Sequence, residues 1–157
     1  MAVTNIGNSP YGTAVPLAFT SGSPLAGVGS PGFAVSTAFA PPVDSSGVYY
    51  DIADIRINMG SDVTLTATTP FIQVKCQPQL DGANFGYVGD SNGVLLPANN
   101  SVFSQYPTNA ASQYFDIVGV PLYPGTNDID VVILNNTGVS FPSTASATLY
   151  PRMSAAD

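Results

Sequence analysis

The stretch Ala53-Asp54-Ile55-Arg56-Ile57-Asn58-Met59 alternates strictly between apolar and polar side chains. Successive side chains of a β-strand point to opposite faces, so this period of two predicts a strand with one buried and one solvated face. The same period recurs over residues 63–68, 72–77, 115–117, 129–133 and 145–149. In the run at 129–134, Val132 and Leu134 are apolar as well, which predicts a strand covered on both faces.

Turn-forming residues separate these runs. They are Gly60-Ser61-Asp62, Pro78, Asp81-Gly82, Asn92-Gly93, Pro124-Gly125 and Asn136-Thr137-Gly138. Such residues favour positive φ or local side-chain-to-backbone hydrogen bonds. Six or more short strands with this punctuation predict an all-β fold, an antiparallel β-sandwich of jelly-roll or immunoglobulin-like type. The nearest candidate for a helix, residues 101–113, is weakened by Pro107.

Residues 1–47 differ from residues 48–157, which we expect to form the sandwich domain. The first segment contains six prolines, many small residues and a single charged side chain, Asp44. Its short apolar pieces are separated by Gly and Pro, which predicts an extended N-terminal arm with one or two short strands at most. Because the arm is almost uncharged, we expect it to lie against its own domain or against a neighbouring molecule.

The composition limits the possible functions. The chain has 157 residues, no His and no Glu, and it carries three cations against ten aspartates, for a net charge of -7. Nucleic-acid binding needs clustered Lys and Arg, so neither nucleic acid nor an anionic membrane is an expected partner. No run reaches the ~20 apolar residues of a membrane span, and the N-terminus lacks the features of a signal peptide. We therefore expect synthesis in a cytoplasm.

Catalytic and metal-binding residue sets are poorly represented. The lone Cys76 lies in an apolar run and has no histidine partner, which indicates a buried structural thiol. Asp51 and Asp54 are three apart and so would point to opposite faces of a strand, whereas Asp128 and Asp130 share a face and are the pair that a small hydrolase could use. Turn and surface roles explain both pairs better. We expect no enzyme activity, no catalytic residue and no cofactor.

Calcium is the metal that the residue types favour most. Asn127, Asp128 and Asp130 cluster in the sequence, as do Asp81 and Asn84, and all of them offer hard oxygen ligands. Neither spacing matches an EF-hand loop, so turn stabilisation is the preferred interpretation. We expect no metal site.

The chain is rich in tyrosine. Tyr49 and Tyr50 are adjacent, and others are spread through predicted loops and strand ends. Exposed tyrosine is common in protein interfaces and in surfaces that stack on sugars, whereas core and edge packing is the ordinary alternative.

Several motifs between Ala53 and Arg152 resemble a family of structural proteins. They are Asp54-Ile55-Arg56-Ile57, Leu80-Asp81-Gly82-Ala83-Asn84-Phe85-Gly86, Val120-Pro121-Leu122-Tyr123-Pro124-Gly125, the run from Asp130 to Gly138, and the last strand from Ala145 to Tyr150. This part of the chain resembles the capsid decoration, or cement, proteins of tailed bacteriophages. The resemblance covers about two-thirds of the chain and omits the arm.

The resemblance implies a virion protein with a β-sandwich body. Such a protein would bind the outer capsid surface, bridge major capsid proteins and form a homo-oligomer, a dimer or a trimer. The acidic body is consistent with the outside of a shell. The expected partner-binding residues are the apolar residues of the arm and the tyrosines that follow it: Val15, Leu17, Phe19, Leu25, Phe33, Val35, Phe39, Tyr49 and Tyr50. The alternative is a carbohydrate- or receptor-binding sandwich of a phage fibre or spike.

Overall fold

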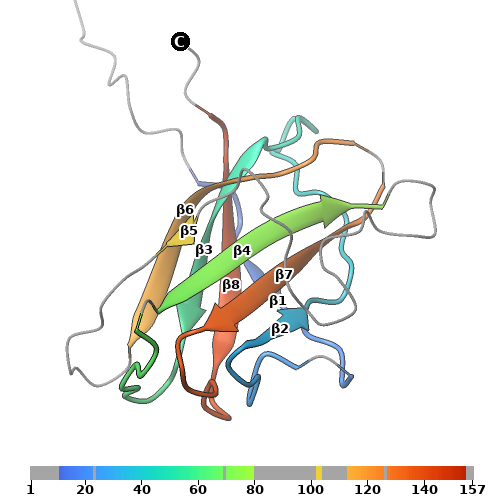
Figure 1. The fold of residues 1–157 in the computed structure, drawn as a ribbon. Helices are drawn as coiled ribbons and strands as arrows, with labels where there is room; N and C mark the ends of the chain where they lie inside the picture. Colours follow the sequence, from blue (N-terminus) through green and yellow to red (C-terminus); the bar gives the residue numbers. More distant parts are fainter. Residues whose placement is uncertain are drawn as a thin grey trace, which may run out of the picture.

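The computed structural model describes residues 11–22, 24–68, 70–79, 102–103, 113–125 and 127–154. Within them the chain forms eight β-strands and no helix, which confirms the all-β prediction (Figure 1). The strands are β1 (Val15–Leu17), β2 (Gly32–Val35), β3 (Ile52–Asn58), β4 (Phe71–Pro78), β5 (Val102–Phe103), β6 (Tyr114–Pro121), β7 (Ile129–Asn136) and β8 (Ser146–Arg152). Most of the helix candidate at residues 101–113 lies outside the described residues.

The eight strands form two antiparallel four-stranded sheets, in the orders β1-β8-β3-β6 and β2-β7-β4-β5. The pairs β1·β8, β2·β7, β3·β6 and β4·β5 are those of one long hairpin folded at the β4–β5 connection. Rolling that hairpin brings β3 beside β8 and β4 beside β7. This winding of eight strands is the jelly roll, so the sandwich is of jelly-roll and not of immunoglobulin-like type.

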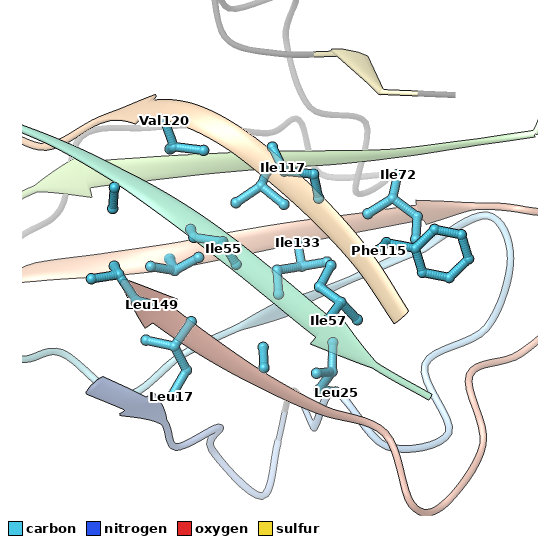
Figure 2. Close-up of a cluster of buried hydrophobic side chains, with 14 of the residues drawn as sticks. Leu17, Leu25, Ile55, Ile57, Ile72, Phe115, Ile117, Val120, Ile133 and Leu149 are labelled. Atoms are coloured by element: carbon cyan, nitrogen blue, oxygen red, sulfur yellow. The ribbon is translucent and has the colours of Figure 1, made fainter. Parts of the chain in front are cut away.

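The core lies between the two sheets, as Figure 2 shows for Ile55, Ile117 and Ile133. All three side chains have no solvent exposure. Burying a side chain of this size stabilises a fold by roughly 1.5–3 kcal/mol, so the predicted inward faces are the main source of stability. Strand β7 is buried along almost its whole length, including Val132 and Leu134, which confirms that it is covered on both faces.

Residues 63–68 do not form the strand that their alternation predicts. Their backbone groups bond to loops and not to a neighbouring strand: the amides of Thr66 and Ala67 both donate to the carbonyl of Thr137, and the amide of Val63 donates to the Gln113 side chain. The reason is position, because this segment crosses from β3 in one sheet to β4 in the other. Val63, one of the apolar residues of this segment, is nevertheless buried in the core.

The described part of the expected arm, residues 11–22 and 24–47, belongs to the sandwich. It contains β1, which pairs with β8, and β2, which pairs with β7. Bridges at Phe19 and Phe39 continue the same contacts, and Leu25 is almost fully buried. The segment is therefore folded back on its own domain, and residue 47 marks no structural boundary. Residues 1–10 of the arm lie outside the described residues.

Candidate binding surface

Most residues expected to bind a partner stabilise the sandwich itself. Leu17, Leu25 and Tyr50 are core residues, and Val15, Phe19 and Phe39 pack against that core. The structure gives these residues a packing role: β1 places Val15 and Leu17, and isolated bridges place Phe19 and Phe39. Their role as contact residues stays a prediction. Tyr49 is half-buried. Phe33 and Val35 point away from the core, since Ala34 between them is the buried residue of β2.

Phe33 and Val35 belong to an apolar cluster on the outer face of the β2-β7-β4-β5 sheet. Phe33 lies opposite Leu134 and Val35 opposite Val132 in the β2·β7 pair. Val35 and Phe71 pack against the buried pair Val132 and Leu134. We call these five residues the outer apolar patch. Phe33 is its most exposed member, at 39%.

The outer face of the other sheet, β1-β8-β3-β6, is polar and aromatic, and Asp54 lies at its centre. A bulge in the β3·β6 pairing occurs between Ala53 and Ile55, and opposite it Gly119 has a φ of 75°. This geometry lets the Gly119 amide donate to Asp54 Oδ1 at 2.9 Å. Arg152 Nε and Nη2 donate to the same carboxylate at 3.2 Å, and the Tyr11 hydroxyl donates at 2.5 Å.

The pKa of Asp54 reflects two opposing effects. Desolvation raises it, but the hydrogen bonds from Tyr11, Arg152 and Gly119 favour the anion more strongly and hold the pKa below its ordinary value. The hydrogen bond to Asp54 raises the pKa of Tyr11 in turn. Asp54 is therefore a charged anchor that joins residue 11, β3, β6 and β8.

A second ion pair lies next along β3. Arg56 Nε and Nη2 donate to Asp116 Oδ1 and Oδ2, both at 2.7 Å, in a bidentate arrangement between register partners of β3 and β6. The Arg56 guanidinium also lies 4.4 Å from the ring centre of Tyr114, a cation–π contact. The two side chains of the pair are 45% and 38% exposed, so this pair remains accessible to a ligand.

These groups enclose an open hollow of about 330 Å³, which we call the tyrosine hollow. Its walls come from the residue-11 segment and from β3, β6 and β8, and it is lined by Tyr11, Asp54, Arg56, Asp116, Val118 and Tyr150. The rings of Tyr11 and Tyr150 meet edge to face, with their centres 6.2 Å apart. From the sequence, the tyrosines were candidates for binding, with core and edge packing as the ordinary alternative. It did not identify Tyr11 or the two arginines, although the alternation in β3 places Asp54 and Arg56 on its outer face.

The other candidate residues do not assemble into a reactive site. Asp51 accepts hydrogen bonds from the amide and hydroxyl of Ser154, and the hydroxyl bond is the larger cause that lowers its pKa. Asp128 is exposed whereas Asp130 is buried, so the second carboxylate pair is not presented together to solvent. Burial raises the pKa of Cys76 to about 12, with a smaller contribution from Asp130, so the thiol stays protonated at neutral pH.

The residues weighed as calcium ligands form no cluster where the structure describes them. Asn127 donates its side-chain amide to the carbonyl of Gln79, so it joins the segment before β7 to the end of β4. Asp81 and Asn84 lie outside the described residues. Among the residues that the structure does describe, no three Asp or Cys side chains group in a way that could hold a metal ion. Nor does any helix in this part of the chain have the length and apolar character to cross a membrane.

Comparison with protein-family models, curated proteins and solved structures finds no match for this chain.

Proposed function

We propose that this chain is a non-enzymatic structural protein of a tailed-phage virion, which binds the outer capsid surface and stabilises the shell by bridging major capsid proteins. The motifs quoted above that resemble decoration proteins support this function. The jelly roll is also compatible with it, because that architecture is used in viral capsid and lectin domains. Synthesis in the host cytoplasm and assembly as a dimer or trimer on the virion belong to the same proposal.

The outer apolar patch is the observation that carries the proposal. A sandwich needs one apolar face per sheet, whereas the β2-β7-β4-β5 sheet has apolar side chains on both of its faces. Phe33, on the edge strand β2, presents a ring that is 39% exposed beside Val35. Aromatic side chains at the centre of an interface contribute a large share of binding energy. We assign the docking of the capsid partner to β2 and this patch.

The use of charge in the described residues also supports a structural role. Asp51, Asp54 and Asp116 each join chain segments that are far apart in sequence. Asp44 accepts the amides of Ser46 and Val48 and so closes the turn before β3. For Asp51 and Asp54 these hydrogen bonds also lower the pKa, so both carboxylates are poor general acids.

The fold decides how the docking is tested. Deleting residues 2–40 would remove β1 and β2 and open the core, so loss of binding after that deletion would not locate the interface. Single substitutions on the surface are the sharper choice. Phe33→Asp places a charge on the patch, and Val118→Asp is the matched control on the opposite sheet, where Val118 is 54% exposed.

The measurement is co-sedimentation with capsids that lack this protein, followed by the temperature at which the decorated particles open. We expect Phe33→Asp to weaken capsid binding at least tenfold and to remove the stabilising effect, while Val118→Asp binds as the unmodified chain does. Circular dichroism tests whether both variants are folded. If Phe33→Asp is unfolded, Phe33→Ala replaces it in the binding measurement. Equal binding of the Phe33 and Val118 variants would contradict the assigned docking surface.

A further inference from the structure

The tyrosine hollow has no part in the proposed capsid docking, because it lies on the sheet opposite to the outer apolar patch. We propose that it is a binding site for a neutral saccharide, a pyranose unit of a glycan. The inference rests on the charge, the aromatic surface and the unused hydrogen-bonding groups of this hollow.

The charge of the hollow indicates a neutral ligand. Asp54 pairs with Arg152 and Asp116 pairs with Arg56, so the four ionised groups sum to zero. An anionic ligand would find each guanidinium already bound to a carboxylate, on a chain whose net charge is -7. A cationic ligand would have to displace an arginine from a bidentate pair. Neither displacement is needed for a ligand without charge.

The surface of the hollow combines apolar area with polar rims. Tyr11 is 57% exposed and Val118 is 54% exposed, and Tyr150 lies beside Tyr11. A pyranose has one face of C–H groups, which packs on aromatic and aliphatic side chains, and hydroxyl groups around its edge. Rings of tyrosine supply such a platform at little cost in side-chain entropy.

Hydrogen-bonding capacity remains at the rim. The Arg56 guanidinium has five N–H groups, and only its Nε and Nη2 donate within the described residues, both to Asp116. The Tyr150 hydroxyl makes no hydrogen bond within the same residues, and each Asp116 oxygen accepts a single bond there. Donors and acceptors side by side suit the paired hydroxyls of a sugar, each of which donates and accepts. Strands β8, β3 and β6 are adjacent, so the hollow is about 10 Å wide.

The test is a titration of the full chain, followed by protein NMR shifts and by saturation transfer to the ligand. The probes are methyl glycosides of glucose, galactose, mannose and N-acetylglucosamine and their disaccharides, up to about 50 mM, so that a dissociation constant in the millimolar range can be measured. Glucuronate and glucosamine are the charged comparisons. We expect at least one neutral probe to bind saturably and more tightly than both charged probes.

Three variants locate the binding. Tyr150→Phe removes only the hydroxyl group and Arg56→Gln removes the charge and the fork of donors, so each is expected to weaken saccharide binding about tenfold. Tyr123→Phe, on an exposed tyrosine outside the hollow, is expected to have no effect. Capsid binding is expected to be unchanged in all three, which separates this site from the proposed docking surface.

Several results would overturn the proposal. They are the lack of saturable binding by every neutral probe, tighter binding of a charged probe, or equal binding by the Tyr150→Phe and Tyr123→Phe chains. Sedimentation velocity tests one further contradicting result, in which a second copy of the chain occupies the hollow. The protein would then self-associate, Arg56→Gln would abolish the self-association, and no saccharide would bind.

Discussion

Gln77 and Asp130 are register partners on β4 and β7. Each has one buried side-chain oxygen without a hydrogen-bond partner among the residues that the structure describes, Gln77 Oε1 and Asp130 Oδ1. The Gln77 side chain forms a hydrogen bond to Asp130, which lowers the pKa of the carboxyl, but desolvation is the larger effect and raises it to about 6. Asp130 is 4% exposed. At neutral pH the fold therefore contains a carboxylate that burial disfavours.

We predict that stability falls as the pH rises through this titration. The folded state binds the Asp130 proton more tightly than the unfolded state does, so the contribution is present below pH 3.8 and is lost by about pH 6. Asp130→Asn should remove that slope and raise the free energy of unfolding at pH 8 by at most about 3 kcal/mol, the equivalent of a two-unit shift. Urea unfolding between pH 4 and pH 8 measures both effects.

Asp128→Asn is the control for this prediction, because Asp128 is exposed two residues away. Its unfolding free energy should keep the same dependence on pH as that of the unmodified chain. An Asp130→Asn chain with an unchanged slope would show that the buried carboxyl is not the titrating group.

Asn135 should be among the most sensitive polar positions. It has no solvent exposure, and its Nδ2 donates to the carbonyls of Val28, Gly29 and Val139 while its Oδ1 accepts the amide and hydroxyl of Thr137. The Val28 carbonyl keeps the Phe141 amide, and the Thr137 hydroxyl keeps the Val139 carbonyl. Asn135→Ala still removes the partner of the Gly29 carbonyl and of the buried Thr137 amide, so we expect a loss of about 3 kcal/mol or more in equilibrium urea unfolding. Asn127→Ala removes one exposed hydrogen bond and should cost less than about 1 kcal/mol. Similar losses for the two variants would contradict this account.

The long strands could be predicted from the sequence because their signal is local. Ile55 and Ile57 alternate with Asp54 and Arg56 within one strand, and β4 alternates in the same way. Strand β7 has a different local signal, a run of apolar residues on both faces. The short strands β1 and β2 have three and four residues, include Pro16 and Gly32, and carry too little pattern to distinguish a sandwich strand from an arm. Pro16 is tolerated because β1 is an edge strand.

The tyrosine hollow could not be predicted because it depends on pairing between distant segments. Arg152 reaches Asp54 across 98 positions of sequence, and Asp116 reaches Arg56 across 60. A period of two fixes which face a side chain points to. It does not fix which strand lies beside it or in which register. The bulge that turns Gly119 toward Asp54 changes that register again.

Gly138 should tolerate no side chain. Its φ is 88°, and a Cβ there would collide with the Ala67 amide nitrogen and with Thr66, in the loop that bonds to the Thr137 carbonyl. Gly47→Ala is a graded control, since its φ of 80° costs about 1–2 kcal/mol while a Cβ meets nothing within 4 Å. We expect Gly138→Ala to destabilise the fold clearly more than Gly47→Ala in thermal unfolding. Equal losses would mean that backbone strain alone, and not the contact with residues 66–67, matters at Gly138.

The two ion pairs of the polar sheet face should contribute unequally. Asp54 and Arg152 are 13% and 22% exposed, and Asp54 also accepts from Tyr11 and Gly119, so we expect Asp54→Asn to cost about 1–3 kcal/mol. Asp116→Asn breaks an exposed pair and should cost less than about 1 kcal/mol, an effect that high salt removes.

The effect of pH on Asp54→Asn follows from the lowered pKa of Asp54. Its contribution to stability is present above pH 3.8 and is lost as the pH falls through the folded-state pKa, so the difference between Asp54→Asn and the unmodified chain should shrink in strong acid. Urea unfolding of Asp54→Asn, Asp116→Asn and the unmodified chain, at pH 7 and pH 2 and at low and high salt, measures these differences. If Asp116→Asn cost as much as Asp54→Asn at pH 7, burial and the additional hydrogen bonds would not be what distinguishes the two pairs.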